Sequence, residues 1–164
     1  PVITGASAAA GPKESGGAIG KYIQTKSKDD MFGEKTFEKA ESKMLYTAVR
    51  NALIASGRLE EDINALIAGD LLNQIISATF TARRMNTGYF GVYNACATFT
   101  EALTLGGMMI DGGYYKNVIC ATSSHFSSAE RQYRYPLELG CTRPPQSQWT
   151  VTGAGACVLS DKGN

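Results

Sequence analysis

Apolar residues recur at helical spacing between residues 36 and 57, which predicts one long amphipathic helix. The apolar face consists of Phe37, Ala40, Met44, Leu45, Ala48, Val49, Ala52 and Leu53. Thr36 suits the N-cap because its hydroxyl oxygen can accept a hydrogen bond from the first turn. Gly57 suits the C-terminal stop. A second, shorter apolar pattern through Ile75, Ile76, Phe80 and Ala82 predicts a helix that closes near residues 86–88.

Short runs rich in β-branched and aromatic residues predict the strands. These runs cover residues 63–68, 89–93, 117–122 and 150–160. Residues 7–13 read as a strand end and loop, residues 14–34 as an irregular surface segment, and residues 123–148 as mostly loop. Because strands alternate with helices, the pattern predicts an α/β fold with a mixed, mostly parallel sheet. The last strand is the candidate for antiparallel pairing.

Residues 94–99 (Asn-Ala-Cys-Ala-Thr-Phe) join an apolar strand to an apolar helix. Between residues 96 and 110 only Glu101 is charged, which predicts a central helix buried on nearly every side. One sheet with helices on two faces would leave part of that helix exposed. We therefore expect the chain to be half of a larger body, completed by a further segment or by another chain.

Cys96 lies in the first turn of this helix, where free backbone N–H groups and the helix dipole favour negative charge. Such a position can lower the pKa of a thiol, or it can hold a carboxylate group. The alternative is a small side chain that only fills the elbow between strand and helix.

Composition narrows the function classes. Sixteen basic and 15 acidic residues give a net charge of +1, and no basic stripe indicates nucleic-acid binding. No apolar run approaches the ~20 residues needed to cross a bilayer. The four cysteines show no CxxC pairing, so we expect a reducing compartment and no zinc site or disulfide framework. The sequence predicts neither a metal centre nor a cofactor.

Polar residues near the predicted strand ends are candidate ligand contacts, because open α/β sheets bind ligands at that edge. They include Ser123, Ser124 and His125, the only histidine, whose alternative role is a loop residue bonded to backbone. Asp70 and Asn73 follow another strand, and their alternative role is to cap the next helix. Arg131 suits a carboxylate, although its Arg- and Tyr-rich surroundings equally fit a subunit interface.

The order of these elements resembles the first half of a thiolase-type fold, a βαβαβαββ repeat. Within that superfamily, five strings resemble the stage V sporulation protein AD family: residues 9–14, 68–74, 121–125, 129–136 and 150–156. The resemblance implies that residues 1–164 form the N-terminal thiolase-like half, with the C-terminal half absent from this chain. It also implies dipicolinate uptake into the developing spore, in the cytoplasm or at the inner spore membrane. The implied partners are membrane proteins of the same operon and a second copy in a homodimer.

The leading hypothesis is a non-catalytic protein that binds dipicolinic acid, as the free acid or as its calcium salt. Its predicted ligand-binding residues are Cys96, Asp70, Asn73, Ser123, Ser124, His125 and Arg131. The alternative is an acyl-transferring enzyme of the thiolase or ketoacyl-synthase type, with Cys96 as nucleophile and a histidine from the other half. Thr98 and Phe99 disfavour that alternative, because enzymes of the superfamily place small residues there. A third hypothesis is an assembly subunit that acts through residues 123–148.

Overall fold

The computed structural model describes residues 1–72, 75–133 and 149–163, without the side chains of residues 130–133. Within these residues the strands form one six-stranded sheet of order β2-β1-β6-β5-β3-β4. The strands are β1 (Val2–Ala10), β2 (Thr25–Lys26), β3 (Ala65–Gly69), β4 (Gly88–Gly91), β5 (Asn117–Ser124) and β6 (Gly153–Ser160). Strand β3 runs parallel to β4 and β5, whereas β6 runs antiparallel to β1 and β5. The predicted α/β fold with a mixed sheet is confirmed.

The described helices are α1 (Pro12–Ser15), α2 (Phe37–Ser56), α3 (Ile76–Ala82), α4 (Thr98–Asp111) and α5 (Phe126–Tyr133). Single 3-10 turns occur at η1 (Gly20–Tyr22), η2 (Glu60–Asp62) and η4 (Ala95–Ala97). Helix α2 begins and ends as predicted: the Thr36 hydroxyl accepts the Lys39 N–H at 3.3 Å. Gly57 follows in the left-handed conformation with φ of 67°, which glycine adopts without steric cost.

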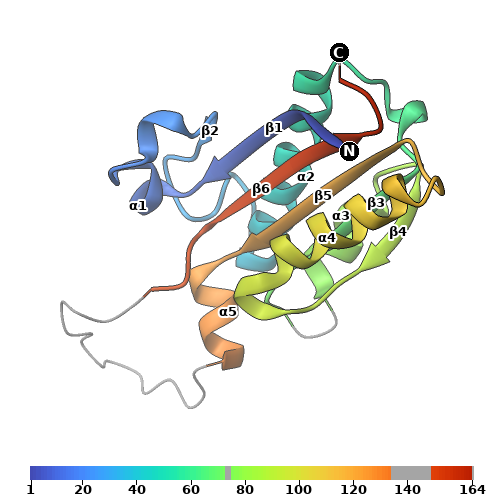
Figure 1. Ribbon diagram of the computed structural model, residues 1–164. Coiled ribbons are helices and arrows are strands. Elements are labelled where there is room, and N and C mark those ends of the chain that lie inside the picture. The colour runs from blue at the N-terminus through green and yellow to red at the C-terminus, as the bar shows by residue number, and fades with distance from the viewer. Residues whose placement is uncertain (73–74, 134–148, 164) are drawn as a thin grey trace, which may run out of the picture.

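Two helical layers sandwich the sheet. Helices α2 and α3 cover one face, and α4 crosses the other (Figure 1). Strand residues alternate between these faces, so Leu66 and Ile119 pack toward α2 while Ile67 and Cys120 pack toward α4. Gly106 allows α4 to approach closely, because a Cβ there would lie 2.9 Å from Val118 Cγ2.

Helix α4 is not buried on every side in this chain, so that prediction is wrong for the described residues. Its buried residues are Thr98, Ala102, Gly106 and Ile110, which follow a four-residue spacing along the face that meets the sheet. On the other face Met108 is 66% exposed. The physical reason is that the described residues supply a covering layer on one side of α4 only.

Two further predictions need correction. Residues 126–133 form helix α5 within the segment predicted to be mostly loop. Residues 14–34, predicted to be irregular, carry the end of α1, the turn η1 and the short edge strand β2. The elements in both segments are only two to eight residues long, so any apolar pattern in them is too short to mark a helix or a strand.

Candidate functional site

The strand-to-helix elbow is open to solvent. Strand β4 ends at Gly91, and residues 93–97, including the free thiol of Cys96, are exposed. The buried Thr98 closes the elbow, because its hydroxyl accepts the Asn94 N–H at 3.0 Å and donates to the Ala95 carbonyl at 2.9 Å. Ala95 has a φ of 42°, an uncommon value for a residue with a Cβ.

The carboxyl-terminal end of β5 reaches the same edge of the sheet, because β3, β4 and β5 are parallel. Thr122 and Ser124 lie on the α4 face and are half-buried. The Thr122 hydroxyl donates to the Gly69 carbonyl at 3.1 Å, and the Ser124 hydroxyl donates to the Val151 carbonyl at 2.6 Å. Thus Cys96 and Ser124 share one face and one edge of the sheet, together with Thr122, which the sequence interpretation missed.

Asp70, by contrast, faces the α2–α3 layer and is 1% exposed. Its carboxylate accepts the Leu72 N–H at 2.8 Å and the Ala78 N–H at 2.7 Å, and Ala78 lies in the first turn of α3. Burial raises the pKa of Asp70, and these backbone hydrogen bonds oppose that shift. The structure therefore gives Asp70 the capping role that was the alternative to ligand contact.

His125 is also inside the protein, with no exposed surface. Its Nδ1 atom lies 3.2 Å from the Ser127 N–H donor, so Nδ1 is an acceptor and Nε2 carries the proton. Nε2 then donates to the Asp30 carbonyl at 2.8 Å. The ring packs against Phe37 and Phe126, with centroids 4.8 and 5.3 Å away. Both ring nitrogens are therefore engaged within the described structure.

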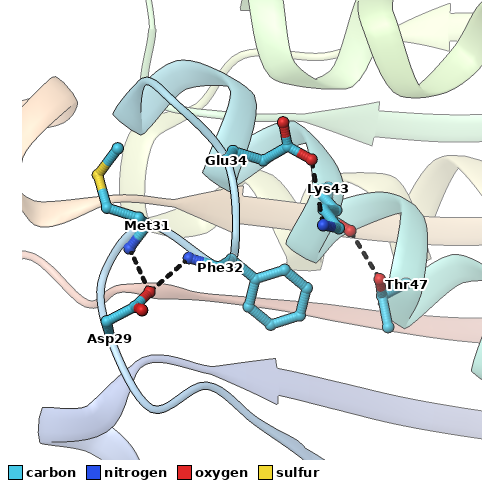
Figure 2. Close-up of polar contacts among 6 residues, drawn as sticks. All are labelled: Asp29, Met31, Phe32, Glu34, Lys43 and Thr47. Carbon is cyan, nitrogen blue, oxygen red and sulfur yellow. Dashed lines mark hydrogen bonds and ion pairs between the residues drawn. The ribbon is translucent and has the colours of Figure 1, made fainter.

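Residues 27–34, which we call the strap, contact His125 through the Asp30 carbonyl. Figure 2 shows the polar contacts that stabilise the strap and its ion pair with α2. One oxygen of Asp29 accepts the N–H groups of Met31 and Phe32, both at 2.9 Å. Glu34 forms an ion pair with Lys43 of α2 at 3.1 Å. These contacts hold the intervening Asp30 carbonyl next to Nε2 of His125.

Glu41 of α2 is a buried polar residue that the sequence interpretation missed. It has no exposed surface, and its two carboxyl oxygens lie 3.0 Å from the Ser123 hydroxyl and 3.1 Å from the Ser128 hydroxyl. Burial, reinforced by the nearby negative charge of Asp70, raises the pKa of Glu41 to about 8. The available signal was an acidic residue one turn after Phe37, on the apolar face of the helix.

The remaining predicted site residues are not placed. Asn73 lies outside the described residues, and the side chain of Arg131 on α5 is not described. Among the described residues, no group of three or more His, Cys, Asp or Glu side chains could hold a metal ion. In the same residues no helix is both long enough and apolar enough to cross a bilayer.

The sequence comparisons identify the family. The family model described as Stage V sporulation protein AD (SpoVAD) matches residues 1–164. The chain belongs to the stage V sporulation protein AD family. It is 40% identical over 159 residues to the stage V sporulation protein AD of Bacillus subtilis (strain 168), covering 96% of this chain and 47% of that relative. This SpoVAD-family chain therefore spans about half the length of the relative.

Solved structures show the same fold at low sequence identity. The 3-oxoacyl-[acyl-carrier-protein] synthase III of Aquifex aeolicus is similar with a TM-score of 0.63 and 19% identity, over 96% of this chain and 53% of that chain. OleA of Xanthomonas campestris is similar with a TM-score of 0.63 and 17% identity, over 96% of this chain and 55% of that one. The SpoVAD-family chain thus has a thiolase-like fold, and at this identity the likeness shows the fold alone.

Proposed function

We propose that the full-length protein binds dipicolinate, free or as its calcium salt, for uptake into the developing spore. In this proposal the elbow at residues 93–97 forms one wall of the binding site. The observation that carries the proposal is this exposed elbow at the start of the 14-residue helix α4, in a member of a sporulation family.

The chemistry of the elbow suits a planar aromatic dianion. N–H groups at the start of α4 and the helix dipole favour a carboxylate group. Thr122 and Ser124 line the same face, where their hydroxyl groups donate to the Gly69 and Val151 carbonyls. Tyr93 is 52% exposed, and its ring offers a surface on which a pyridine ring can stack.

The described residues provide Cys96 with no histidine that could act as its base, so the acyl-transfer alternative depends on a base from the other half. A nucleophilic thiol needs a base that can take its proton. His125, the only histidine of the chain, is buried with both ring nitrogens engaged. Asp70 and Glu41 lie in the layer on the opposite face of the sheet.

The acyl-transfer alternative keeps one observation in its favour, the exposed thiol at the elbow. It predicts fast alkylation of Cys96 by iodoacetamide at neutral pH in the full-length protein. The binding proposal predicts that saturating dipicolinate slows alkylation of Cys96.

Calorimetry on the full-length protein, with and without Ca²⁺, tests the proposal. We expect saturable dipicolinate binding and weaker binding of isophthalate, which lacks the ring nitrogen. Ser124→Ala should weaken binding about tenfold, because the hydroxyl group that fixes the Val151 carbonyl beside the proposed site is lost. Thr47→Val, which changes a half-buried hydroxyl of α2 that donates to the Lys43 carbonyl at 2.8 Å, is the matched control and should bind as the wild type. No dipicolinate binding under either condition would contradict the proposal.

The same proposal places the protein in the developing spore, in the cytoplasm or at the inner spore membrane. There it acts as a homodimer beside the stage V sporulation membrane proteins of its operon. Light scattering on the full-length protein tests the dimer: twice the chain mass is expected, and a monomer at micromolar concentration would contradict it.

A further inference from the structure

Glu41 ties together three elements that meet behind the proposed site. Glu41 belongs to α2, and Ser128 lies in α5. Ser123 is the last residue of β5 whose side chain faces α2. The Glu41 carboxyl group has no exposed surface and contacts both serine hydroxyl groups. Burying a carboxyl group costs desolvation free energy, and hydrogen bonds to these two hydroxyl groups offset part of that cost.

The two serines bracket the segment that carries Ser124 and His125. Ser123 and Ser124 point to opposite faces of the sheet, so anchoring the first sets where the second lies. At the start of α5, the His125 carbonyl accepts the Ala129 N–H at 2.9 Å and the Ser128 hydroxyl at 3.4 Å. Fixing Ser123 and Ser128 therefore fixes the turn between them.

We infer that Glu41 is a positioning residue of the proposed dipicolinate site: its carboxyl group, held between Ser123 and Ser128, sets the turn that presents Ser124 to the ligand. This inference rests on the proposed function for its ligand. Glu41 itself lies on the opposite face of the sheet from Cys96 and acts only through the turn.

The charge state of Glu41 gives the inference a pH signature. The groups that act on it are Glu38 of its own helix and Asp70 after β3, and both raise its pKa, which burial brings to about 8. His125, the titratable neighbour from the β5 side, has both ring nitrogens paired. The Ser123 and Ser128 hydroxyl groups donate to the carboxyl oxygens and lower this pKa, but burial and Asp70 outweigh them, so the carboxyl group is protonated near pH 7. Above pH 8 it ionises close to Asp70, which disturbs the turn.

The test compares four variants of the full-length protein. Glu41→Gln keeps one donor and one acceptor at every pH, Glu41→Ala removes both, and Ser128→Ala removes one partner while the acid stays. Glu61→Gln, which neutralises an exposed carboxylate, is the matched control. Dipicolinate affinity is measured at pH 7 and pH 9, where the ligand stays a dianion. Hydrogen exchange of peptides spanning residues 120–130 is measured without ligand.

At pH 7 we expect about tenfold weaker binding in Glu41→Ala, an intermediate loss in Ser128→Ala, and wild-type affinity in Glu41→Gln. At pH 9 the wild type and the Glu61→Gln control weaken about threefold or more, whereas Glu41→Gln does not. Faster exchange in the 120–130 peptides should accompany each loss of affinity.

The inference is overturned if Glu41→Ala folds and keeps both wild-type affinity and wild-type exchange. Should Glu41→Ala fail to fold, wild-type affinity in Ser128→Ala together with equal pH profiles for wild type and Glu41→Gln would overturn it. A wild type that binds no dipicolinate at any pH refutes the proposed function instead. In that case the exchange data alone decide whether Glu41 holds the turn.

Discussion

At the scale of single residues, burial decides the role of the polar side chains at the carboxyl-terminal edge of the sheet. Cys96 is exposed and Ser124 is half-buried on the α4 face, whereas Asp70 and His125 are enclosed on the α2 side. Four residues that follow strands in the sequence therefore divide into two groups. Cys96 and Ser124 are accessible to a ligand. Asp70 and His125 instead form hydrogen bonds to backbone groups near the same edge of the sheet.

The raised pKa of Glu41 predicts a measurable pH dependence of stability. The pKa rises from 4.5 to about 8 on folding, so between these values the folded state holds a proton that the unfolded state has lost. The free energy of unfolding therefore falls as pH rises, by up to about 1.4 kcal/mol per pH unit, and levels off above pH 8. Denaturant unfolding of the full-length protein at pH 5, 6.5 and 8 measures this slope.

The Glu41→Gln variant should lose that part of the slope because its amide does not titrate. Glu61→Gln, at an exposed position, should keep the wild-type slope. Equal slopes for the wild type and Glu41→Gln would show that Glu41 does not carry a proton into the folded state.

Contacts between individual side chains were the hardest feature to predict from the sequence. Ser123 and Ser128 lie 82 and 87 positions from Glu41, so no local pattern marks the three as partners. His125 was recognised as a candidate, but the strap that covers it comes from a segment 95 positions away. Such contacts depend on tertiary packing, which one sequence does not display.

At the scale of elements, the elbow depends on a close backbone approach. A Cβ on Gly69 would collide with the Val92 carbonyl oxygen and would lie 2.7 Å from Thr98 Cγ2. Gly69→Ala should therefore displace the elbow and lower the free energy of unfolding by about 2–4 kcal/mol. Thermal and denaturant unfolding of the full-length protein check this.

Gly155 offers a matched control in strand β6, because nothing lies within 4 Å of the position that its Cβ would take. Gly155→Ala should be neutral or slightly stabilising, since alanine restricts the unfolded chain more than glycine does. A Gly69→Ala variant as stable as Gly155→Ala would contradict the packing described for the elbow.

Elements with a strong local signal were predictable. Helix α2 has a continuous apolar stripe and both caps, and strand β3 and residues 118–121 of strand β5 are apolar runs. Helix α5 was missed because its apolar positions, Phe126, Ala129 and Tyr133, span only about two turns, and so short a helix depends on what it packs against. The predicted role of Arg131 on that helix stays a prediction.

At the scale of the whole molecule, the outer face of α4 has no covering layer among the described residues. Met108 is exposed there, and Leu103 and Leu105 are partly exposed. A helix that carries apolar residues on both faces is most stable when a second layer of structure covers the face that does not meet the sheet. The chain spans about half of its relative, so we expect the rest of the full-length protein to supply that layer.

Met108→Asp tests this expectation in two contexts. In the full-length protein it should lower the unfolding temperature by several degrees, because a charge would be buried. In residues 1–164 alone, where Met108 faces solvent, it should reduce self-association measured by light scattering. An unchanged unfolding temperature in the full-length protein would mean that α4 stays exposed there.

The most direct test of the central claim is whether dipicolinate shields Cys96 in the full-length protein. Mass spectrometry follows alkylation of Cys96 by iodoacetamide with and without the ligand. The account predicts that saturating dipicolinate slows alkylation of Cys96 at least about tenfold, whereas isophthalate at the same concentration leaves the rate nearly unchanged. An alkylation rate that dipicolinate does not alter would place the ligand away from the elbow and contradict the account.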